Sequence, residues 1–288
     1  MNLNTLDIVL HHTTRYNKPC PTNIDGIIIN AVKPPIYLNK LIEYTVISFV
    51  LSGDDHRVIL GGQSYLIQAG HAYFVPFEMP ITVQFKNQNQ PKFLSISMIL
   101  QETWLSQIIQ KYHLNTPNKH HATPPSGVAV SAMNQATKNC LVRLIELLDN
   151  PNPALSELYK QELVIHLLGT PLGEHLIAFT NQNSQLQKIK RVSDHLQKHW
   201  ADKLVMADLA HLVGMGESSF FSHFKAITGF SPLQYQKSLR LNYAKEMILK
   251  GDLSISQIAY NVGYESMSQF SREYKRQFGV SPSDTHQP

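Results

Sequence analysis

An imperfect internal repeat of about fifty residues occupies positions 204–282, and it constrains this chain more than any other feature. The first copy contains MADLAHLVG followed by SSFFSHFKAITGFSP, and the second contains ISQIAYNVG followed by SQFSREYKRQFGVSP. Matching residues lie 49 apart up to the shared glycine and 50 apart after it. The one-residue slip falls in a turn, where insertions are tolerated better than inside packed helices.

Each copy predicts a short helix, a tight turn and a second helix. In the second copy the apolar residues Ile255, Ile258, Ala259 and Val262 recur on one face of a helix. Gly263 follows, and glycine commonly ends a helix because it tolerates positive φ. The pattern therefore predicts a helix that stops at this glycine.

The second helix of each copy begins at a capping signal. Ser266, with Gln269 three residues later, matches a capping box, and Gly216 takes the cap position in the first copy. Phe270 and Tyr274 are four apart and give this helix one buried face. The residues between these anchors are expected to point outward: Ser218, Ser219, Phe221, Ser222 and Lys225 in the first copy, and Met267, Ser268, Gln269, Arg272, Lys275 and Arg276 in the second.

An apolar helix, a glycine turn and a polar, partly basic second helix are typical of a helix-turn-helix. Such a helix fits the major groove, where Gln and Arg make paired bonds to adenine and guanine, while Lys and Arg near its ends pair with phosphates. The alternative is two ordinary helical hairpins. Two copies at a fixed period favour the DNA-binding interpretation, because two helix-turn-helix units can enter successive major grooves about 34 Å apart. The predicted partner is double-stranded promoter DNA.

From about Gln187 to Pro288 the chain resembles the DNA-binding domain of the AraC/XylS transcription regulators. The resemblance implies that the second helix of each unit enters the major groove, although Phe221 has the alternative of packing against the regulatory domain or lying free on the surface. By position, the base-facing residues are Ser218, Phe221 and Ser222 in the first unit, and Met267, Ser268, Gln269 and Arg272 in the second. The matching motifs are Arg240-Leu241, Ile258-Ala259, Gly263-Tyr264, Phe270-Ser271-Arg272, Tyr274-Lys275 and Phe278-Gly279-Val280-Ser281-Pro282.

Composition and charge agree with a DNA-binding protein of two domains. The length of 288 residues suits about two domains, and all of the net charge of +4 comes from 186–288, which holds 13 Lys and Arg against 9 Asp and Glu. Cys20 and Cys140 have no paired spacing, which argues against a disulfide framework or a zinc finger and fits a cytoplasmic location. The sequence has no run of 18 apolar residues and its N-terminus lacks signal-peptide features, so no membrane segment is expected.

Residues 24–100 predict a β-rich domain. Short runs of β-branched and aromatic residues are separated by turn signals at 52–55, 61–62 and 69–70, as expected for a β-sandwich or barrel. This segment also resembles the cupin-like sensor half of AraC-type regulators. The motifs that carry this resemblance are Leu51-Ser52-Gly53, Gly61-Gly62-Gln63-Ser64-Tyr65 and Ala69-Gly70-His71.

The expected role of the sensor half is to bind a small-molecule effector. Alternation along the strands puts Ile47 and Phe49 on one side of one strand, and Tyr73 and Val75 on one side of another, which makes these four the candidate pocket residues. Ordinary core packing is the alternative for each of them. A second alternative is that this half binds no ligand and serves dimerisation or a protein partner.

No metal, cofactor or enzymatic activity is expected. His56 and His71 stand alone, whereas zinc and iron sites need three or four converging ligands. The adjacent pairs His11-His12 and His120-His121 are expected in flexible segments, where neighbouring side chains seldom face one ion. The sequence also shows no nucleophile elbow, phosphate loop or pair of catalytic carboxylates.

The expected fold class is α+β, with a cupin-like domain at 1–122, a helical layer and linker at 123–185, and the DNA-binding domain at 186–288. In the middle segment Leu141, Leu144, Ile145 and Leu148 form an apolar stripe, which suits either a homodimer contact or burial within one subunit. Effector binding is expected to change the orientation or flexibility of the C-terminal half and so to alter promoter occupancy or contact with RNA polymerase. Resemblance to the family favours activation over repression.

Overall fold

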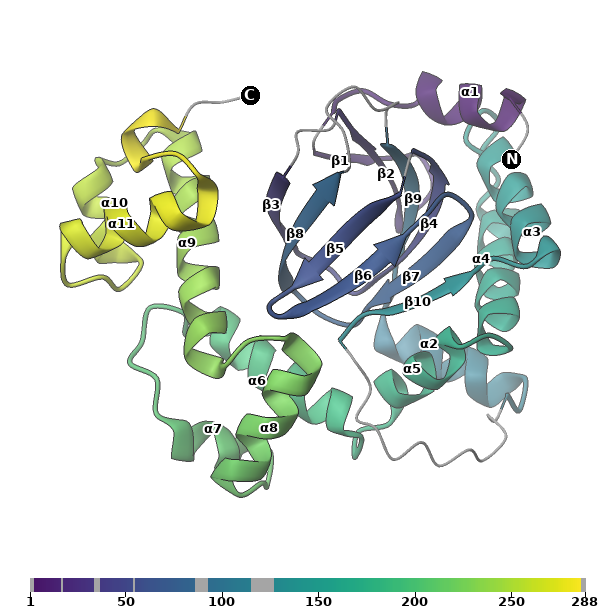
Figure 1. The fold of residues 1–288 in the computed structure, drawn as a ribbon. Helices are drawn as coiled ribbons and strands as arrows, with labels where there is room; N and C mark the ends of the chain where they lie inside the picture. The colour runs from purple at the N-terminus through teal and green to yellow at the C-terminus, as the bar shows by residue number, and fades with distance from the viewer. Residues whose placement is uncertain are drawn as a thin grey trace.

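Two β-sheets packed face to face form the centre of the N-terminal half in the computed structural model (Figure 1), which describes residues 3–16, 18–33, 37–53, 55–85, 93–114 and 127–285. One sheet has the strand order β1-β2-β9-β4-β7-β10 and the other has the order β3-β8-β5-β6. All pairings between neighbouring strands are antiparallel. The strands are β1 Pro19–Pro21, β2 Ile27–Val32, β3 Tyr37–Ile42, β4 Val46–Ser52, β5 His56–Leu60, β6 Gln63–Ile67, β7 His71–Val75, β8 Met79–Phe85, β9 Phe93–Ile99 and β10 Ala129–Ala132.

The predicted strand runs are confirmed, and three strands appear that were not predicted. Of the three turn signals, only Gly61-Gly62 forms a hairpin; those at 52–55 and 69–70 connect strands of different sheets, β4 to β5 and β6 to β7. The β5–β6 hairpin turns at Gly61-Gly62, with Leu60 paired to Gln63. The unpredicted strands are β1 and β10, which lie outside the stretch 24–100 where strands were predicted, and β3, which lies within it. β10 pairs with β7, so the sheet continues beyond residue 122, where the sequence suggested that the β domain ends. The break expected around residue 123, like the pair His120-His121, lies outside the described residues.

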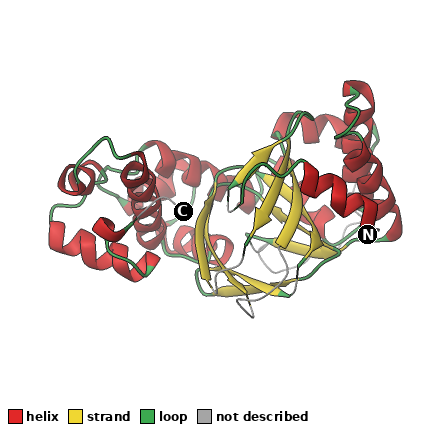
Figure 2. Cartoon of the chain, turned by 90° about the horizontal axis from the view of Figure 1, so that it is seen from above, coloured by secondary structure: helices red, strands yellow, loops and turns green. Residues whose placement is uncertain are grey.

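Helices cover the outer face of the six-stranded sheet (Figures 1 and 2). Phe179 of α5 packs edge-on against Phe74 of β7, with 5.7 Å between ring centroids. The predicted stripe, which runs along α3 and ends at Leu148 just after it, is buried within the chain at all four positions, so burial within one subunit is confirmed and the stripe is closed to a dimer contact. His11 ends a helix that the sequence did not suggest, and His12 pairs with Asp149 at 2.9 Å. These helices are α1 Leu3–His11, α2 Glu102–Lys111, α3 Gln135–Glu146, α4 Pro153–Leu168 and α5 Leu172–Thr180.

The C-terminal part is helical in the described residues and lies to one side of the sheets (Figures 1 and 2). Among the described residues, no single helix has the length and apolarity to span a membrane, and α4 with α5 meets that test only as a pair bent by 112°. The helices are α6 Gln185–Lys198, α7 Met206–Leu212, α8 Glu217–Thr228, α9 Pro232–Lys250, α10 Ile255–Asn261 and α11 Met267–Phe278, followed by the short 3-10 turn η1 Pro282–Asp284.

Candidate nucleic-acid interface and effector cavity

The first repeat copy folds as α7, a turn and α8. Leu209 and Val213 of the first helix are buried, and Gly214 takes a φ of +62° in the turn that follows. Phe220 and Phe224 are fully buried on the inner side of α8, with their ring centroids 5.6 Å apart. The predicted helix, glycine turn and second helix are therefore confirmed for this copy.

The second copy repeats this arrangement with α10 and α11. Phe270 and Tyr274 occupy the inner side of α11, again with 5.6 Å between ring centroids. Ser266 caps the helix by accepting a bond from the backbone N–H of Gln269. The Gln269 side chain does not complete the predicted capping box, because its amide donates to Glu273 at 3.2 Å instead.

Glu273 is a buried acid on α11, the second helix of the second copy, which together with α8 is called a recognition helix below. Its carboxylate accepts bonds from Lys237 at 2.9 Å, from Tyr264 at 2.8 Å and from Gln269. Burial opposes ionisation, but these three donors hold the pKa of Glu273 below its ordinary value. The one acid on α11 is thus satisfied inside the unit and leaves the outer face to basic and polar side chains.

Arg240 of α9 ties the two units together. Its guanidinium donates to the carbonyls of Trp200 and Ala201, in the segment that precedes the first unit, and to that of Gly263, in the turn of the second. The sequence pattern marked Arg240 only as the start of a connecting helix and gave no sign of this bridge. Because one planar group holds both segments, Arg240 helps to fix how the two recognition helices are oriented relative to each other.

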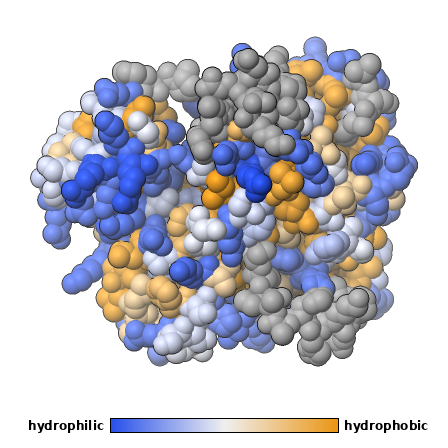
Figure 3. Space-filling view, in the orientation of Figure 1, coloured by the Kyte–Doolittle hydropathy of each residue, from blue (hydrophilic) through white to orange (hydrophobic). Residues whose placement is uncertain are grey.

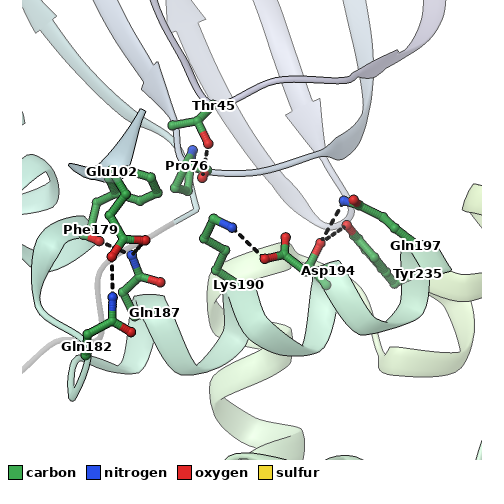
Figure 4. Close-up of polar contacts among 11 residues, drawn as sticks. Thr45, Pro76, Glu102, Phe179, Gln182, Gln187, Lys190, Asp194, Gln197 and Tyr235 are labelled. Atoms are coloured by element: carbon green, nitrogen blue, oxygen red, sulfur yellow. Dashed lines mark hydrogen bonds and ion pairs between the residues drawn. The ribbon is translucent and has the colours of Figure 1, made fainter. Parts of the chain in front are cut away.

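The α6 helix attaches the first unit to the sensor half. Gln187 donates to Glu102 of α2 at 2.8 Å, and Gln182 donates to the same carboxylate (Figure 4). Further along α6, Ser193 bonds to the hydroxyl of Tyr235 at 2.7 Å. The same tyrosine hydroxyl donates to the backbone carbonyl of Glu78, so α6, α9 and the β7–β8 turn meet at one buried point.

Glu78 also uses its side chain at this junction. Its carboxyl accepts a bond from the hydroxyl of Tyr243 at 2.9 Å. Burial raises the pKa of Glu78 to about 7; the Tyr243 bond works against that shift, and the nearby carboxylates of Glu43, Glu246 and Asp194 add to it. The carboxyl therefore changes its charge near neutral pH at the contact between the sheets and α9.

Side-chain amides of the small sheet reach the ends of both recognition helices. Gln63 donates to the carbonyl of Ala226 near the end of α8 at 2.9 Å, and Asn39 donates to the carbonyl of Gln277 near the end of α11. At the first contact Gly61 and Gly229 approach so closely that a Cβ on Gly61 would lie 1.9 Å from the Gly229 carbonyl oxygen. Only glycine fits there, and the first unit is fitted tightly to the β5–β6 turn.

A cavity of about 640 Å³ lies between the inner face of the sheets and α9. Its apolar lining includes Ile27, Val46 and Ile99 from the strands, and Leu249 from α9. Asn39 also lines it, and this is the residue that contacts the end of α11. The size and mainly apolar lining suit a small molecule, and an occupant would touch both halves of the chain.

Two protein families match this arrangement. Residues 23–175 match the family described as AraC-type transcriptional regulator N-terminus, which is more than half of the chain, and residues 209–287 match the family described as helix-turn-helix domain. The chain belongs to the AraC-type transcription regulators.

Among individual relatives, ExsA of Pseudomonas aeruginosa, an HTH-type transcriptional regulator, is 30% identical over 165 residues, which cover 57% of this chain and 59% of ExsA. The virulence regulon transcriptional activator VirF of Yersinia enterocolitica is 30% identical over 160 residues, covering 52% of this chain and 55% of VirF. The chain thus spans little more than half the length of either relative. The unsaturated fatty acid-bound structure of ToxT from Vibrio cholerae shares the fold, with a TM-score of 0.55 at 14% identity over 94% of this chain and 96% of ToxT.

The outward residues predicted for this AraC-type chain take unequal positions. On α8, Ser218, Ser219, Phe221, Ser222 and Lys225 are exposed. On α11, Ser268, Arg272, Lys275 and Arg276 are exposed, whereas Met267 is partly buried against the core of the second unit and Gln269 is partly buried beside Glu273. Their contacts with DNA remain predictions.

The predicted effector residues do not share one surface. Ser48, which pairs with Tyr73, lines the cavity, so Ile47 and Phe49 face the other way. Of the four candidates, Tyr73 lines the cavity and Ile47, Phe49 and Val75 are buried in the core without lining it. Alternation fixes the two sides of one strand but not which side faces the other sheet, so only Tyr73 of the four meets this cavity, and effector binding by any of them stays a prediction.

The single histidines have structural partners in this chain. His56 is buried between the rings of Phe85 and Phe93, and the His71 ring accepts a bond from the backbone N–H of Gln68. Within the described part of the chain, no three His, Cys, Asp or Glu side chains come close enough to hold a metal ion.

Proposed function

We propose that this AraC-type chain is a sequence-specific regulator of transcription that inserts α8 and α11 into successive major grooves of promoter DNA. The observation that supports this most directly is the pair of helix-turn-helix units, joined by α9 and Arg240, each with an exposed second helix. One face of the molecule shows hydrophilic side chains gathered over the second unit and a more apolar surface over the first (Figure 3). Such a protein would act on DNA in the cytoplasm.

A comparison of specific and scrambled duplexes tests this function. Sites are selected from a random duplex pool with the full chain, and affinities for the selected and scrambled duplexes are then measured by fluorescence anisotropy across a salt series. Binding should weaken as salt rises, because phosphate contacts release counterions. The triple variant Arg272→Ala, Lys275→Ala, Arg276→Ala should flatten that dependence by about 0.9 in log–log slope for each phosphate that no longer has a cationic partner.

The control variant is Lys111→Ala, which removes an exposed cation from α2 on the sensor half. It should leave both the affinity and the salt dependence unchanged. Equal affinity for selected and scrambled duplexes would refute sequence-specific binding, and loss of binding in the control would refute the assignment of the surface.

The regulatory half is proposed to bind a small-molecule effector in the cavity beside α9. The related fold of ToxT holds an unsaturated fatty acid, which supports ligand control of the same architecture. Here the lining includes Asn242, Lys245 and Leu249 of the helix that joins the two DNA-reading units. A ligand that prefers one orientation of α9 would shift the population of DNA-competent chains by its difference in affinity for the two states.

Activation is the favoured outcome, because the relative VirF is a transcriptional activator. Contact with RNA polymerase and formation of a homodimer complete the proposal. Since the α3 stripe is buried, a dimer would use another surface, and exposed Leu155 and Leu158 on α4 are the candidates. A sensor half that binds only a protein partner, with no ligand, is the alternative.

A further inference from the structure

Four polar side chains form a row across the floor of the cavity. Asn30 of β2 donates to Ser97 of β9 at 2.8 Å, Ser97 and Ser48 of β4 are bonded at 2.6 Å, and Tyr73 of β7 is hydrogen-bonded to Ser48. All four line the cavity, and Ser48, Ser97 and Tyr73 are buried. The row follows four strands that are neighbours in the six-stranded sheet.

The strand register explains why these groups meet on one face. Ser48 lies directly opposite Ser97 on one side and opposite Tyr73 on the other. Directly opposed residues of antiparallel strands point to the same face, so the hydroxyls are brought together on the inner face of the six-stranded sheet. Around them the strand lining is mostly apolar, with Val46 and Ile99 nearby in sequence. Polar groups buried in such surroundings are costly unless each one is bonded.

The hydrogen bonds within this row leave one hydroxyl hydrogen without an acceptor. Ser97 accepts a bond from Asn30, and Ser48 is bonded to both Ser97 and the Tyr73 hydroxyl. The three hydroxyl hydrogens of Ser48, Ser97 and Tyr73 therefore serve two bonds, and one of them is unused whichever group donates. Among the described contacts, this hydroxyl hydrogen and the remaining N–H of Asn30 are left to a bound molecule, and both call for an acceptor oxygen.

Charge is arranged differently at the rim and at the floor. Arg15, Lys18 and Glu43 line the rim and are exposed, while Lys245 and Glu246 approach from α9. None of the described lining residues on β2, β4, β7 and β9 carries a charge. A charged group pushed to the floor would be buried without a partner of opposite sign, which is strongly unfavourable. The floor therefore suits an uncharged acceptor.

We propose that the cavity recognises an uncharged carbonyl compound, with its carbonyl oxygen on the hydroxyl row of Ser48, Ser97 and Tyr73 and its apolar body directed towards α9. This inference rests on the proposed effector role of the cavity and adds the chemical class of the ligand. It assigns Asn30, Ser48, Ser97 and Tyr73 as the recognition residues and treats the charged rim as the entrance.

Octanamide and octanoate are matched probes, since they share the apolar chain and differ in the charge of the head group. Calorimetric titration of the full chain at pH 7.5 should show tighter binding of octanamide. The Ser48→Ala/Ser97→Ala double variant should bind octanamide about tenfold more weakly, which is the effect of removing one hydrogen bond of ordinary strength. The single Ser97→Ala variant serves the same purpose with less disturbance of the buried row.

The control is Lys111→Met, which removes an exposed cation of α2 that does not line the cavity and should leave octanamide affinity unchanged. Lys245→Met, which removes the half-buried cation of α9 that lies over the Phe278 ring, tests whether a charged head group is bound there instead. Preferential binding of octanoate that depends on Lys245 and ignores the serines would overturn the proposal, and so would binding of neither probe. Anisotropy with selected DNA separates this result from the effector role: octanamide binding without any change in DNA affinity keeps the ligand class and removes the control of transcription.

Discussion

The two helix-turn-helix units have the same sequence pattern but are joined to the sensor in different ways. Buried residues of the first unit, such as Leu209, Phe220 and Phe224, belong to one core that is continuous with that of the β-sheets. The second unit has a core of its own, made of Leu241, Ala244, Ile258, Ala259, Val262, Tyr264, Phe270 and Tyr274. Two copies of a similar local sequence thus fold into one unit that is fixed to the sensor and one that packs mainly on itself.

Their outer faces differ in the same direction. The α8 helix carries one Glu and one Lys, whereas α11 carries Arg272, Lys275 and Arg276 with its single Glu held inside by Lys237. The unit with the separate core is therefore also the unit with the stronger DNA-reading chemistry. Under the proposed function, this combination would let the sensor control the better reader without dismantling the core that both halves share.

Removing the central ring of each unit is expected to have the largest effect. Phe220→Ala and Phe270→Ala should each cost about 3–5 kcal/mol, because both rings are fully buried and leave cavities. Phe270→Ala should expose the amides of α10 and α11 to hydrogen exchange while the sheets stay protected. Phe220→Ala should lower protection in α8 and in the sheets together.

Hydrogen exchange followed by mass spectrometry distinguishes these patterns, with the wild-type chain as reference. If Phe270→Ala reduces protection of the β-strands as much as that of α11, the second core is not independent and the comparison fails.

Substitution of one outward residue in each unit should have the next largest effect. Arg272→Ala should weaken binding to a selected DNA site by about 1–3 kcal/mol, the range for a paired bond to guanine. Ser222→Ala, which removes one exposed hydroxyl of α8, should cost about 1 kcal/mol or less. Competition binding at a fixed salt concentration measures both, and equal losses would show that the two units read sequence equally.

The helices of these units were predictable because their signals are local. Apolar spacing, the glycine turn and the cap at Ser266 all lie within one turn or two of the residues they organise. The same kind of reasoning found the β5–β6 hairpin at Gly61-Gly62. It missed β10, a four-residue strand that is held by its pairing with β7 rather than by its own pattern.

The effector cavity and the contacts between the halves could not be read in this way. β4 is buried on both sides, so its sequence does not say that Ser48 faces the cavity while Phe49 faces away. The bonds from Gln63 to Ala226 and from Asn39 to Gln277 join positions more than 160 residues apart. Such pairs are set by the tertiary fold and leave no periodic signal.

The smallest expected effect concerns Glu78, which contacts the helix that both units share. Its folded pKa of about 7 lies above the ordinary value of 4.5, so the neutral form is the one that folding favours. That contribution to stability is fully present below pH 4.5 and is lost as the pH rises through about 7. Since Glu78 is half-buried, solvent screening limits the change to about 1 kcal/mol.

Thermal denaturation of the wild type and of Glu78→Gln across pH 5 to 8 tests this step. The variant, which keeps an acceptor for Tyr243 but cannot ionise, should lose less stability as the pH rises. Because the first unit keeps its separate contact at Gly61 and Gly229, loosening at high pH should appear by hydrogen exchange in α10 and α11 before it appears in α8. If α8 instead exchanges before α10 and α11, the junction at Glu78 holds the first unit in place, and high pH does not release the second unit.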